Sequence, residues 1–371
     1  MAMLYIHIPF CRRICTYCDF YRIGSVALLP RLIPALLAEM EQRADYLSDR
    51  ALSSIYFGGG TPSLLAPEQI TQILGRIGEL FDCSAVEEIT IEANPDDLTE
   101  EYVSRLARTA VNRVSLGIQS FDDEALRFMN RRHTAEQAEE AVRRLRAHGI
   151  DNISIDIIFG IAGFGGEALS ETLRRAIALD VGHISAYHLT VEESTRLGVL
   201  TRRGEYTPVD EATSEAEFLA VHRALTEAGY EHYEVSNFAK RGWRARHNSS
   251  YWRGVEYLGL GPGAHSFAAD NRTWCVSTVA EYVEGIYRYE DEVLGWREHL
   301  NEYIMTSLRT AEGLDLGYIA SRFGAAAAER IEHAAKVWQD ADTLRRDGNR
   351  IYILPQKFLL SDAVIESMFI A

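Results

Sequence analysis

Three cysteines near the amino terminus have a spacing that suits one metal centre. Cys11, Cys15 and Cys18 lie in the sequence Cys-Arg-Arg-Ile-Cys-Thr-Tyr-Cys, directly after the strand-like residues 4–10. A structural zinc ion is closed by four protein ligands, whereas an iron–sulfur cubane held by three thiolates keeps one iron free for a molecule from solution. The missing fourth ligand favours a [4Fe-4S] cluster in which one iron has a free coordination site. Such an iron indicates a reactive site and not a purely structural one.

Two other interpretations of these cysteines are weaker. A disulfide would leave one of the three thiols unpaired, and no signal peptide points to an oxidising compartment. A zinc site that recruits His7 stays open, although the alternation around His7 more simply places this residue on one face of a strand. Cys83 and Cys275 stand alone in the sequence, and we expect them to be small buried hydrophobic residues.

The composition is that of an ordinary soluble protein with a large core. The chain has 371 residues, of which 47% are hydrophobic, and its formal net charge is -16. This length allows more than one domain, and the negative charge opposes non-specific attraction to nucleic acid or anionic lipid. No apolar run reaches the roughly 18 residues that a membrane-spanning helix needs. We expect a cytoplasmic protein with no nucleic-acid partner and no transmembrane segment.

Apolar strand-like runs alternate with amphipathic helical stretches over the first 236 residues. The runs are residues 54–57, 88–92, 113–118, 152–159 and 183–189, and helical patterns lie at 31–46, 67–81, 100–109, 135–148 and 167–179. Such alternation is typical of parallel strands joined by helical crossovers. We predict an α/β fold in which a parallel (β/α) sheet is closed or partly closed into a barrel.

Four of these predicted strands end in residues that suit a functional site. Gly-Gly-Gly-Thr at residues 58–61 follows one strand, and Glu92, Gln119 and Asp156 stand at the ends of the next three. In parallel barrels, function gathers at the carboxyl ends of the strands. The repetition over four strands predicts that these residues share one site.

The alternation fades after His247. Residues 257–264 form a Gly-rich and aromatic loop sequence, which is followed by helices, including a long one at about 325–347 and a β-hairpin over 351–360. We predict three parts: a barrel core over 1–236, a connecting segment over 237–296, and a small, mainly helical, winged-helix-like domain over 297–371. The last part lacks a basic recognition face, so a structural or partner-binding role is expected instead of DNA binding.

The cysteine spacing and the glycine motif together resemble those of the radical S-adenosylmethionine (SAM) enzymes. The resemblance lies in Cys-x3-Cys-x2-Cys after the first strand and Gly-Gly-Gly-Thr-Pro, residues 58–62, at the next strand end. It implies that Cys11, Cys15 and Cys18 hold a [4Fe-4S] cluster whose fourth iron is chelated by SAM. In this family one electron from the reduced cluster cleaves SAM to methionine and a 5′-deoxyadenosyl radical.

The same resemblance implies a SAM pocket, residue by residue. The family's positions fall here on Tyr5, Tyr17, Gly59, Gly60, Thr61, Glu92, Gln119, Arg131 and Asp156. Glycines permit close approach of the backbone to the methionine end, arginine suits a carboxylate, and acids and amides suit ribose hydroxyls. Each of these residues also has a structural alternative, such as helix capping or a solvated charge, but as a set on successive strands they favour the pocket.

Further motifs resemble the branch that contains oxygen-independent coproporphyrinogen oxidase and the HemW-type haem chaperones. The chaperones fit better, because Cys18 is followed by Asp19 and not by the oxidase's further cysteine nearby, and the oxidase's extension before the cluster is missing here. The chaperones also have a His-Asn-x-x-Tyr-Trp motif, which matches residues 247–252. This implies that His247 is an axial ligand of haem, with a surface or hydrogen-bonded histidine as the alternative.

We therefore expect a protein that binds haem, a [4Fe-4S] cluster and SAM, and that delivers haem to acceptor haemoproteins such as respiratory enzymes. An electron donor is implied, and homodimerisation and peripheral membrane contact are open. The competing functions are oxidative decarboxylation of coproporphyrinogen III and another radical SAM reaction such as methyl transfer. One departure is the sequence Phe-Gly-Ile-Ala-Gly-Phe-Gly-Gly at 159–166, which replaces the family's usual Gly-Leu-Pro-Gly-Gln and places the geometry of this loop in doubt.

Overall fold

Six parallel strands form the centre of the protein. The computed structural model describes residues 1–370. The six are β1 (Ala2–Ile8), β2 (Leu52–Gly59), β3 (Glu88–Ala93), β4 (Arg113–Gln119), β5 (Ile153–Phe159) and β6 (His183–His188), hydrogen-bonded in this order. The strands are buried almost along their whole length, as expected for a parallel sheet that is covered on both faces.

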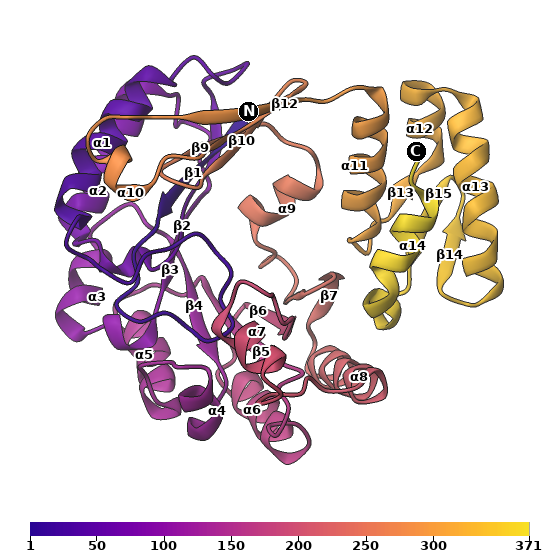
Figure 1. Ribbon diagram of the computed structural model, residues 1–371, viewed down its shortest axis with the longest axis horizontal. Coiled ribbons are helices and arrows are strands. Elements are labelled where there is room, and N and C mark those ends of the chain that lie inside the picture. The colour runs from indigo at the N-terminus through magenta and orange to yellow at the C-terminus, as the bar shows by residue number, and fades with distance from the viewer. Residues whose placement is uncertain (371) are drawn as a thin grey trace.

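Helical crossovers join these strands and cover the outer face of the sheet (Figure 1). They are α1 (Leu29–Gln42), α2 (Pro67–Leu80), α3 (Glu100–Leu106), α4 (Asp123–Phe128), α5 (Ala135–Ala147) and α6 (Glu167–Ala178), with short 3-10 turns at Pro62–Leu64 and Pro95–Asp97. Two more helices, α7 (Arg196–Arg202) and α8 (Glu211–Glu227), follow β6. Local signals fix several of their ends. Thr134 and Gln137, for example, form a reciprocal capping box at the start of α5. The predicted α/β order is confirmed.

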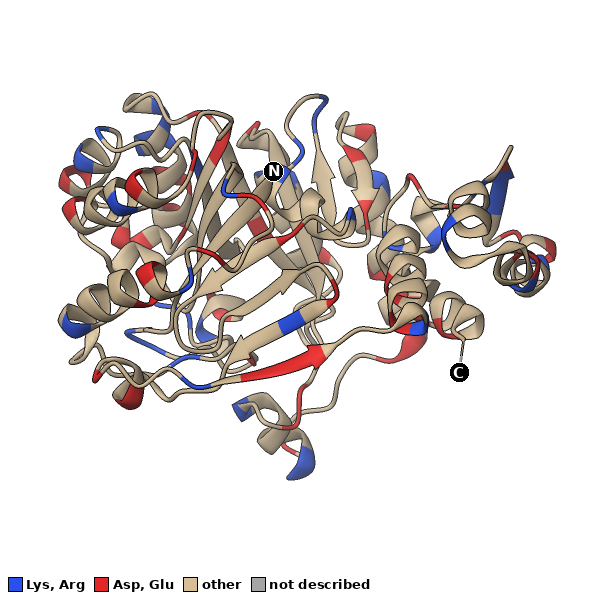
Figure 2. Ribbon diagram, turned by 90° about the horizontal axis from the view of Figure 1, so that it is seen from above, with Lys and Arg blue, Asp and Glu red and all other residues tan. Residues whose placement is uncertain are grey.

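The sheet has more strands than the sequence indicated, and its two edge strands do not pair to close a barrel. It has 12 strands in the order β12-β11-β10-β9-β1-β2-β3-β4-β5-β6-β8-β7, so β12 and β7 are its two edges. The added strands are β7 (Glu231–Glu234), β8 (Asn237–Ala239), β9 (Tyr257–Leu260), β10 (His265–Ala268), β11 (Asn271–Cys275) and β12 (Tyr289–Val293). The barrel is therefore of the partly closed kind. The edge strand β12 has three successive acidic residues, and Figure 2 shows a red strand at the rim of the sheet.

The prediction of a loop over 257–264 was wrong in its first half. Residues 257–260 form β9, which pairs in parallel with β1 through Tyr5 and Gly259, among others. A Cβ atom on Gly259 would lie 2.0 Å from the backbone oxygen of His265. The glycine that looked like a loop signal is instead required by the close approach of two chain segments.

The carboxyl-terminal part packs helices around a small antiparallel sheet. Its elements are α11 (Trp296–Leu308), β13 (Leu314–Asp315), α12 (Leu316–Phe323), α13 (Ala325–Asp340), β14 (Leu344–Asp347), β15 (Arg350–Ile353), a 3-10 turn at Pro355–Leu360 and α14 (Ser361–Met368). The long helix ends earlier than predicted, and the hairpin precedes the predicted one because its turn is made by Gly348 and Asn349. Within residues 1–370 we find no helix that is both long and apolar enough to cross a membrane.

Two glycine substitutions test this packing. Gly75 lies within α2 with no atom within 4 Å of an added Cβ, whereas Gly259 is blocked by backbone. Gly75→Ala should raise the free energy of unfolding by about 0.5–1 kcal/mol through helix propensity. Gly259→Ala should lower it by about 1–3 kcal/mol because β9 must shift. Urea unfolding measures both, and a neutral Gly259→Ala would contradict the described β9 packing.

Candidate functional site

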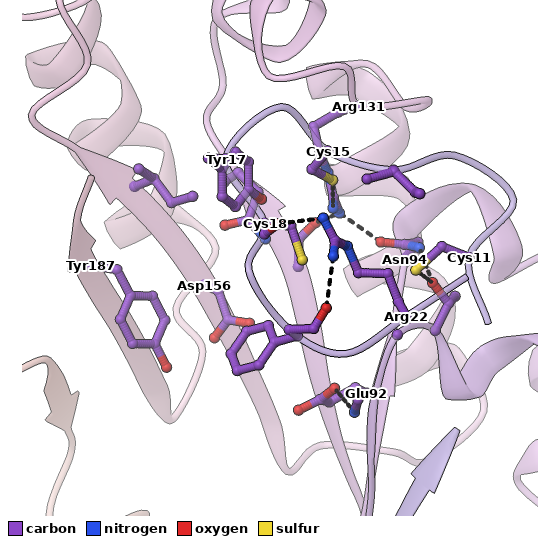
Figure 3. A pocket seen from close by; sticks show the side chains of 18 of the residues that line it. Cys11, Cys15, Tyr17, Cys18, Arg22, Glu92, Asn94, Arg131, Asp156 and Tyr187 are labelled. Carbon is purple, nitrogen blue, oxygen red and sulfur yellow. Dashed lines mark hydrogen bonds between the residues drawn. The ribbon is translucent and has the colours of Figure 1, made fainter. Parts of the chain in front are cut away.

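A cavity of about 450 Å³ lies at the carboxyl ends of the central strands. Its walls come from two sides (Figure 3): the loop that follows β1 supplies Cys11, Cys15 and Cys18, and strands β3 and β5 supply Glu92 and Asp156, the latter from the middle of its strand. All three cysteines are free thiols. The structure thus brings together the two sets of residues that the sequence had singled out separately.

The three thiols are arranged around the cavity and do not converge on one point. Cys11 is buried, while Cys15 and Cys18 are partly exposed. Within residues 1–370 no three His, Cys, Asp or Glu side chains are close enough to share a single metal ion. A cubane binds its protein ligands at separate irons, so well-separated thiols on one cavity wall suit a cluster of this kind.

The cysteine loop is held in place by its neighbours in space. Thr16 donates from its backbone N–H to Met129 O (3.2 Å) and accepts at its own carbonyl from the Leu197 N–H (2.8 Å). Asn130 Nδ2 donates to Ile14 O (2.7 Å). The end of α4 and the start of α7 therefore fix a loop that has no regular structure of its own.

Arg131 connects this loop to the strand ends. Its guanidinium donates to Cys15 Sγ (3.3 Å), to Asn94 Oδ1 (2.6 Å) and to Gly117 O (2.5 Å). Asn94 in turn donates to Thr61 Oγ1 (3.3 Å), which lies 3.5 Å from Cys11 Sγ. The remaining Nε of Arg131 is buried and without a hydrogen-bond partner among the described residues. A buried, unpaired donor of a cation lining the cavity suits an anionic ligand group such as a carboxylate.

Glycines allow the end of β2 to pass close to the end of β1. Gly59 has φ +113°, a conformation that side chains disfavour, and an added Cβ would lie 2.7 Å from the His7 ring. A Cβ on Gly60 would lie 2.7 Å from Phe10 O. These glycines are thus demanded by chain packing, and their exposed backbone also lines the cavity next to Thr61.

Two carboxyl groups face the cavity from β3 and β5, the strands on either side of β4. Glu92 accepts hydrogen bonds from Tyr56 Oη (2.9 Å) and from the Gly59 N–H (3.1 Å). Removal from water raises the pKa of Glu92 to about 7, against the opposing effect of the Tyr56 hydrogen bond. Removal from water likewise raises the pKa of Asp156 to about 6, and a hydrogen bond from Ser185 opposes it. Both groups are suited to accept hydroxyl donors from a bound ligand.

Gln119 stands at an irregular point of β4. Its φ is +72°, which is unusual for a residue other than glycine, and the register between β4 and β5 shifts here. Such a bulge re-aims a side chain, and Gln119 lines the cavity. Tyr17 lines it too, but Tyr5 does not: its hydroxyl bonds His7 Nδ1 (3.0 Å) and its ring stacks on Tyr56.

His247 lies away from this cavity and is fully buried. Its Nδ1 is 2.8 Å from Ser54 Oγ and its Nε2 is 3.1 Å from Tyr251 Oη, so both ring nitrogens are engaged. Burial lowers the pKa of His247 to about 3, and the charge of buried Arg113 adds to the effect. In this conformation His247 is a buried, hydrogen-bonded histidine that lies between the rings of Tyr56 and Tyr251.

Three residues of the site were missed from the sequence. Asn94 links Arg131 to Thr61, Tyr56 holds Glu92, and Tyr187 projects into the cavity opposite Asp156 (Figure 3). The rule that strand ends carry function could have found Asn94 and Tyr187, since they follow β3 and end β6. Tyr56 lies inside its strand and gave no such signal.

Comparison with known proteins places this geometry in context. The Radical SAM superfamily model matches residues 5–176, and the HemN C-terminal domain model matches residues 297–357. The heme chaperone HemW of Lactococcus lactis is 32% identical over 99% of this chain and 97% of its own length, and that of Bacillus subtilis is 34% identical over 98% of both. The solved structure of coproporphyrinogen III oxidase (HemN) from Escherichia coli, a radical SAM enzyme, superposes with a TM-score of 0.84 at 21% identity, covering 99% of this chain and 90% of that one.

The raised pKa of Glu92 predicts a pH dependence of stability. Between pH about 4.5 and 7 the folded chain retains a proton on Glu92 that the unfolded chain has released, so the free energy of unfolding falls as pH rises. Glu92→Gln, which stays neutral, should make this decline shallower by up to about 1.4 kcal/mol per pH unit. Urea unfolding of the cluster-free protein across this window measures it. Glu193→Gln, on an exposed loop, is the control, and equal slopes for Glu92→Gln and wild type would contradict the assignment.

Proposed function

This chain belongs to the HemW family of haem chaperones within the radical SAM superfamily, and from that premise we propose that it binds haem, a [4Fe-4S] cluster and SAM and delivers haem to acceptor haemoproteins. The observation that supports the cofactor part is the single cavity shared by three free thiols, Arg131 and the carboxyls of Glu92 and Asp156. The names of the relatives, which match over nearly the whole chain, support the haem part.

In this proposal the residues of the cavity hold and orient the cofactors. When bound, a reduced [4Fe-4S] cluster would supply the electron that cleaves SAM. Cys11, Cys15 and Cys18 would hold the cluster, and the Arg131 guanidinium, which lines the cavity, would bind the SAM carboxylate. Glu92 and Asp156 would accept the ribose hydroxyls, Gln119 would complete the pocket, and Gly59, Gly60 and Thr61 would border the methionine end.

Haem delivery is the second half of the proposal. The acceptors would be haemoproteins, such as respiratory enzymes, in the cytoplasm or facing it, and an electron donor would serve the cluster. Axial ligation by His247 would require α9 (Arg246–Trp252) to leave the sheet, because both ring nitrogens are now hydrogen-bonded. The similarity to HemN concerns the fold, and the sequence Asp19-Phe20 after Cys18 does not supply the oxidase's further cysteine.

Anaerobic reconstitution tests the cluster. Wild-type protein should take up about four irons and sulfides per chain and release 5′-deoxyadenosine from SAM with a reductant. Cys11→Ala, Cys15→Ala and Cys18→Ala should each lose most of the cluster, since a missing thiolate opens a second iron. Cys83→Ala, far from the cavity, is the matched control. Iron content that is equal in all four variants, or one zinc per chain, would overturn the assignment of Cys11, Cys15 and Cys18 as cluster ligands.

Haem titration tests the chaperone function. The Soret absorption of haem should shift and saturate with wild-type protein, and bound haem should pass to an apo-haemoprotein. His247→Ala should lower the free energy of unfolding by about 2–4 kcal/mol, because it leaves a cavity and unpaired hydroxyls. If His247→Ala, checked to be folded, loses the wild-type Soret position, His247 is the ligand and α9 opens. Wild-type protein without haem affinity would refute the function.

A further inference from the structure

A second cavity, of about 300 Å³, lies between α9 and the carboxyl-terminal helices. Figure 1 shows α9 between the sheet and α11. None of the residues around the three cysteines lines this second cavity, which we call the interdomain cavity. His247 faces the sheet, whereas Ser249, Trp252 and Arg253 of the same short helix line the interdomain cavity. The His-Asn-x-x-Tyr-Trp motif therefore contributes to two different environments.

Positively charged side chains surround the interdomain cavity, although the protein as a whole is acidic. Arg244, Arg253 and Arg350 line it, each from a different segment of the chain. Arg244 pairs with Glu312 (3.1 Å) and Glu231 (3.2 Å), and Arg253 is only 3.8 Å from the same Glu312. Arg350 donates to the backbone oxygen of Glu312 (3.3 Å) and has no carboxylate partner among the described residues. Arg244 and Arg253 thus share two carboxylates while Arg350 has none, and N–H donors are left for an anion.

Aromatic rings form the other walls. Tyr233, Trp252, Tyr303 and Tyr318 line the interdomain cavity. The rings of Tyr303 and Tyr318 lie 4.6 Å apart, and Tyr318 is 46% exposed. Ser249 Oγ, which is buried, has no hydrogen-bond partner within residues 1–370. Unpaired donors beside flat apolar surfaces are what a planar ligand with acidic groups requires.

We propose that the interdomain cavity binds the carboxylate edge of a tetrapyrrole, with Arg253 and Arg350 on the propionates and the aromatic rings against the macrocycle. This inference rests on the proposed haem function and adds a site to it. A guanidinium pairs with a carboxylate through two parallel hydrogen bonds, which suits two propionates on one edge. The volume is at the lower end of ligand sites, so one edge enters and the rest of the ring lies along exposed Tyr318.

The test is haem titration of the full-length protein with paired arginine variants. Arg253→Gln together with Arg350→Gln should weaken haem binding about tenfold or more, because both charge-assisted pairs with the propionates are lost. The matched control is Arg246→Gln with Arg346→Gln, from the same helix and the same hairpin, whose partners Glu87 and Glu332 lie outside the interdomain cavity. Haem dimethyl ester, which lacks free carboxylates, should bind wild type weakly and all variants equally.

A second variant distinguishes the effect of losing arginine charge from the effect of losing cavity volume. Ser249→Leu fills the interdomain cavity without removing an arginine, and it should weaken haem binding to a similar extent. Thermal unfolding and cluster content check that each variant is folded. Wild-type haem binding together with unchanged affinity in both the double arginine variant and Ser249→Leu would overturn this site and leave the chaperone function standing. Failure of wild type to bind haem would instead refute the function on which the site depends.

Discussion

The functional cavity depends on one buried cation. Arg131 reaches Cys15, Asn94 and the carbonyl of Gly117, and so connects a loop without regular structure to the ends of β3 and β4. A buried guanidinium is expensive unless its donors are paired, so each pairing restricts the position of the loop. Arg131 also lines the cavity, so the side chain that positions the Cys15 loop contributes positive charge to the cavity wall.

Beneath the cavity, polar groups continue into the centre of the sheet. Tyr56 donates a hydrogen bond to Glu92, its ring lies tilted against that of His247 with centroids 5.0 Å apart, and it stacks on Tyr5. His247 is in turn held by Ser54 and Tyr251. Such a network is stable only when nearly every member is paired, which makes it rigid. A rigid floor keeps Glu92 in place, while the exposed loop above it remains open to large ligands.

Local patterns explain which parts of the fold were predictable. The periodicity of apolar residues identified the alternation of strands and helices, and the expected strand ends identified Glu92 and Gln119, because neighbouring residues alone set these signals. Asp156 was expected at a strand end but lies in the middle of β5. The sequence was misleading where the same residue type can be required for two different structural reasons. Gly259 was taken for a loop residue but lies in a crowded strand, and the terminal hairpin was displaced because its first strand, β14, lies within the stretch assigned to a helix.

The sequence by itself determined the three closely spaced cysteines, the α/β order and the family resemblance, since each depends on the identity and spacing of residues along the chain. Only the tertiary structure decided that Arg131 meets Asn94 and Cys15, that His247 is buried with both nitrogens engaged, and that three arginines gather beside α9. These contacts join residues separated by tens to hundreds of positions. Burial and pairing between such residues arise from packing of the whole chain, which no local pattern records.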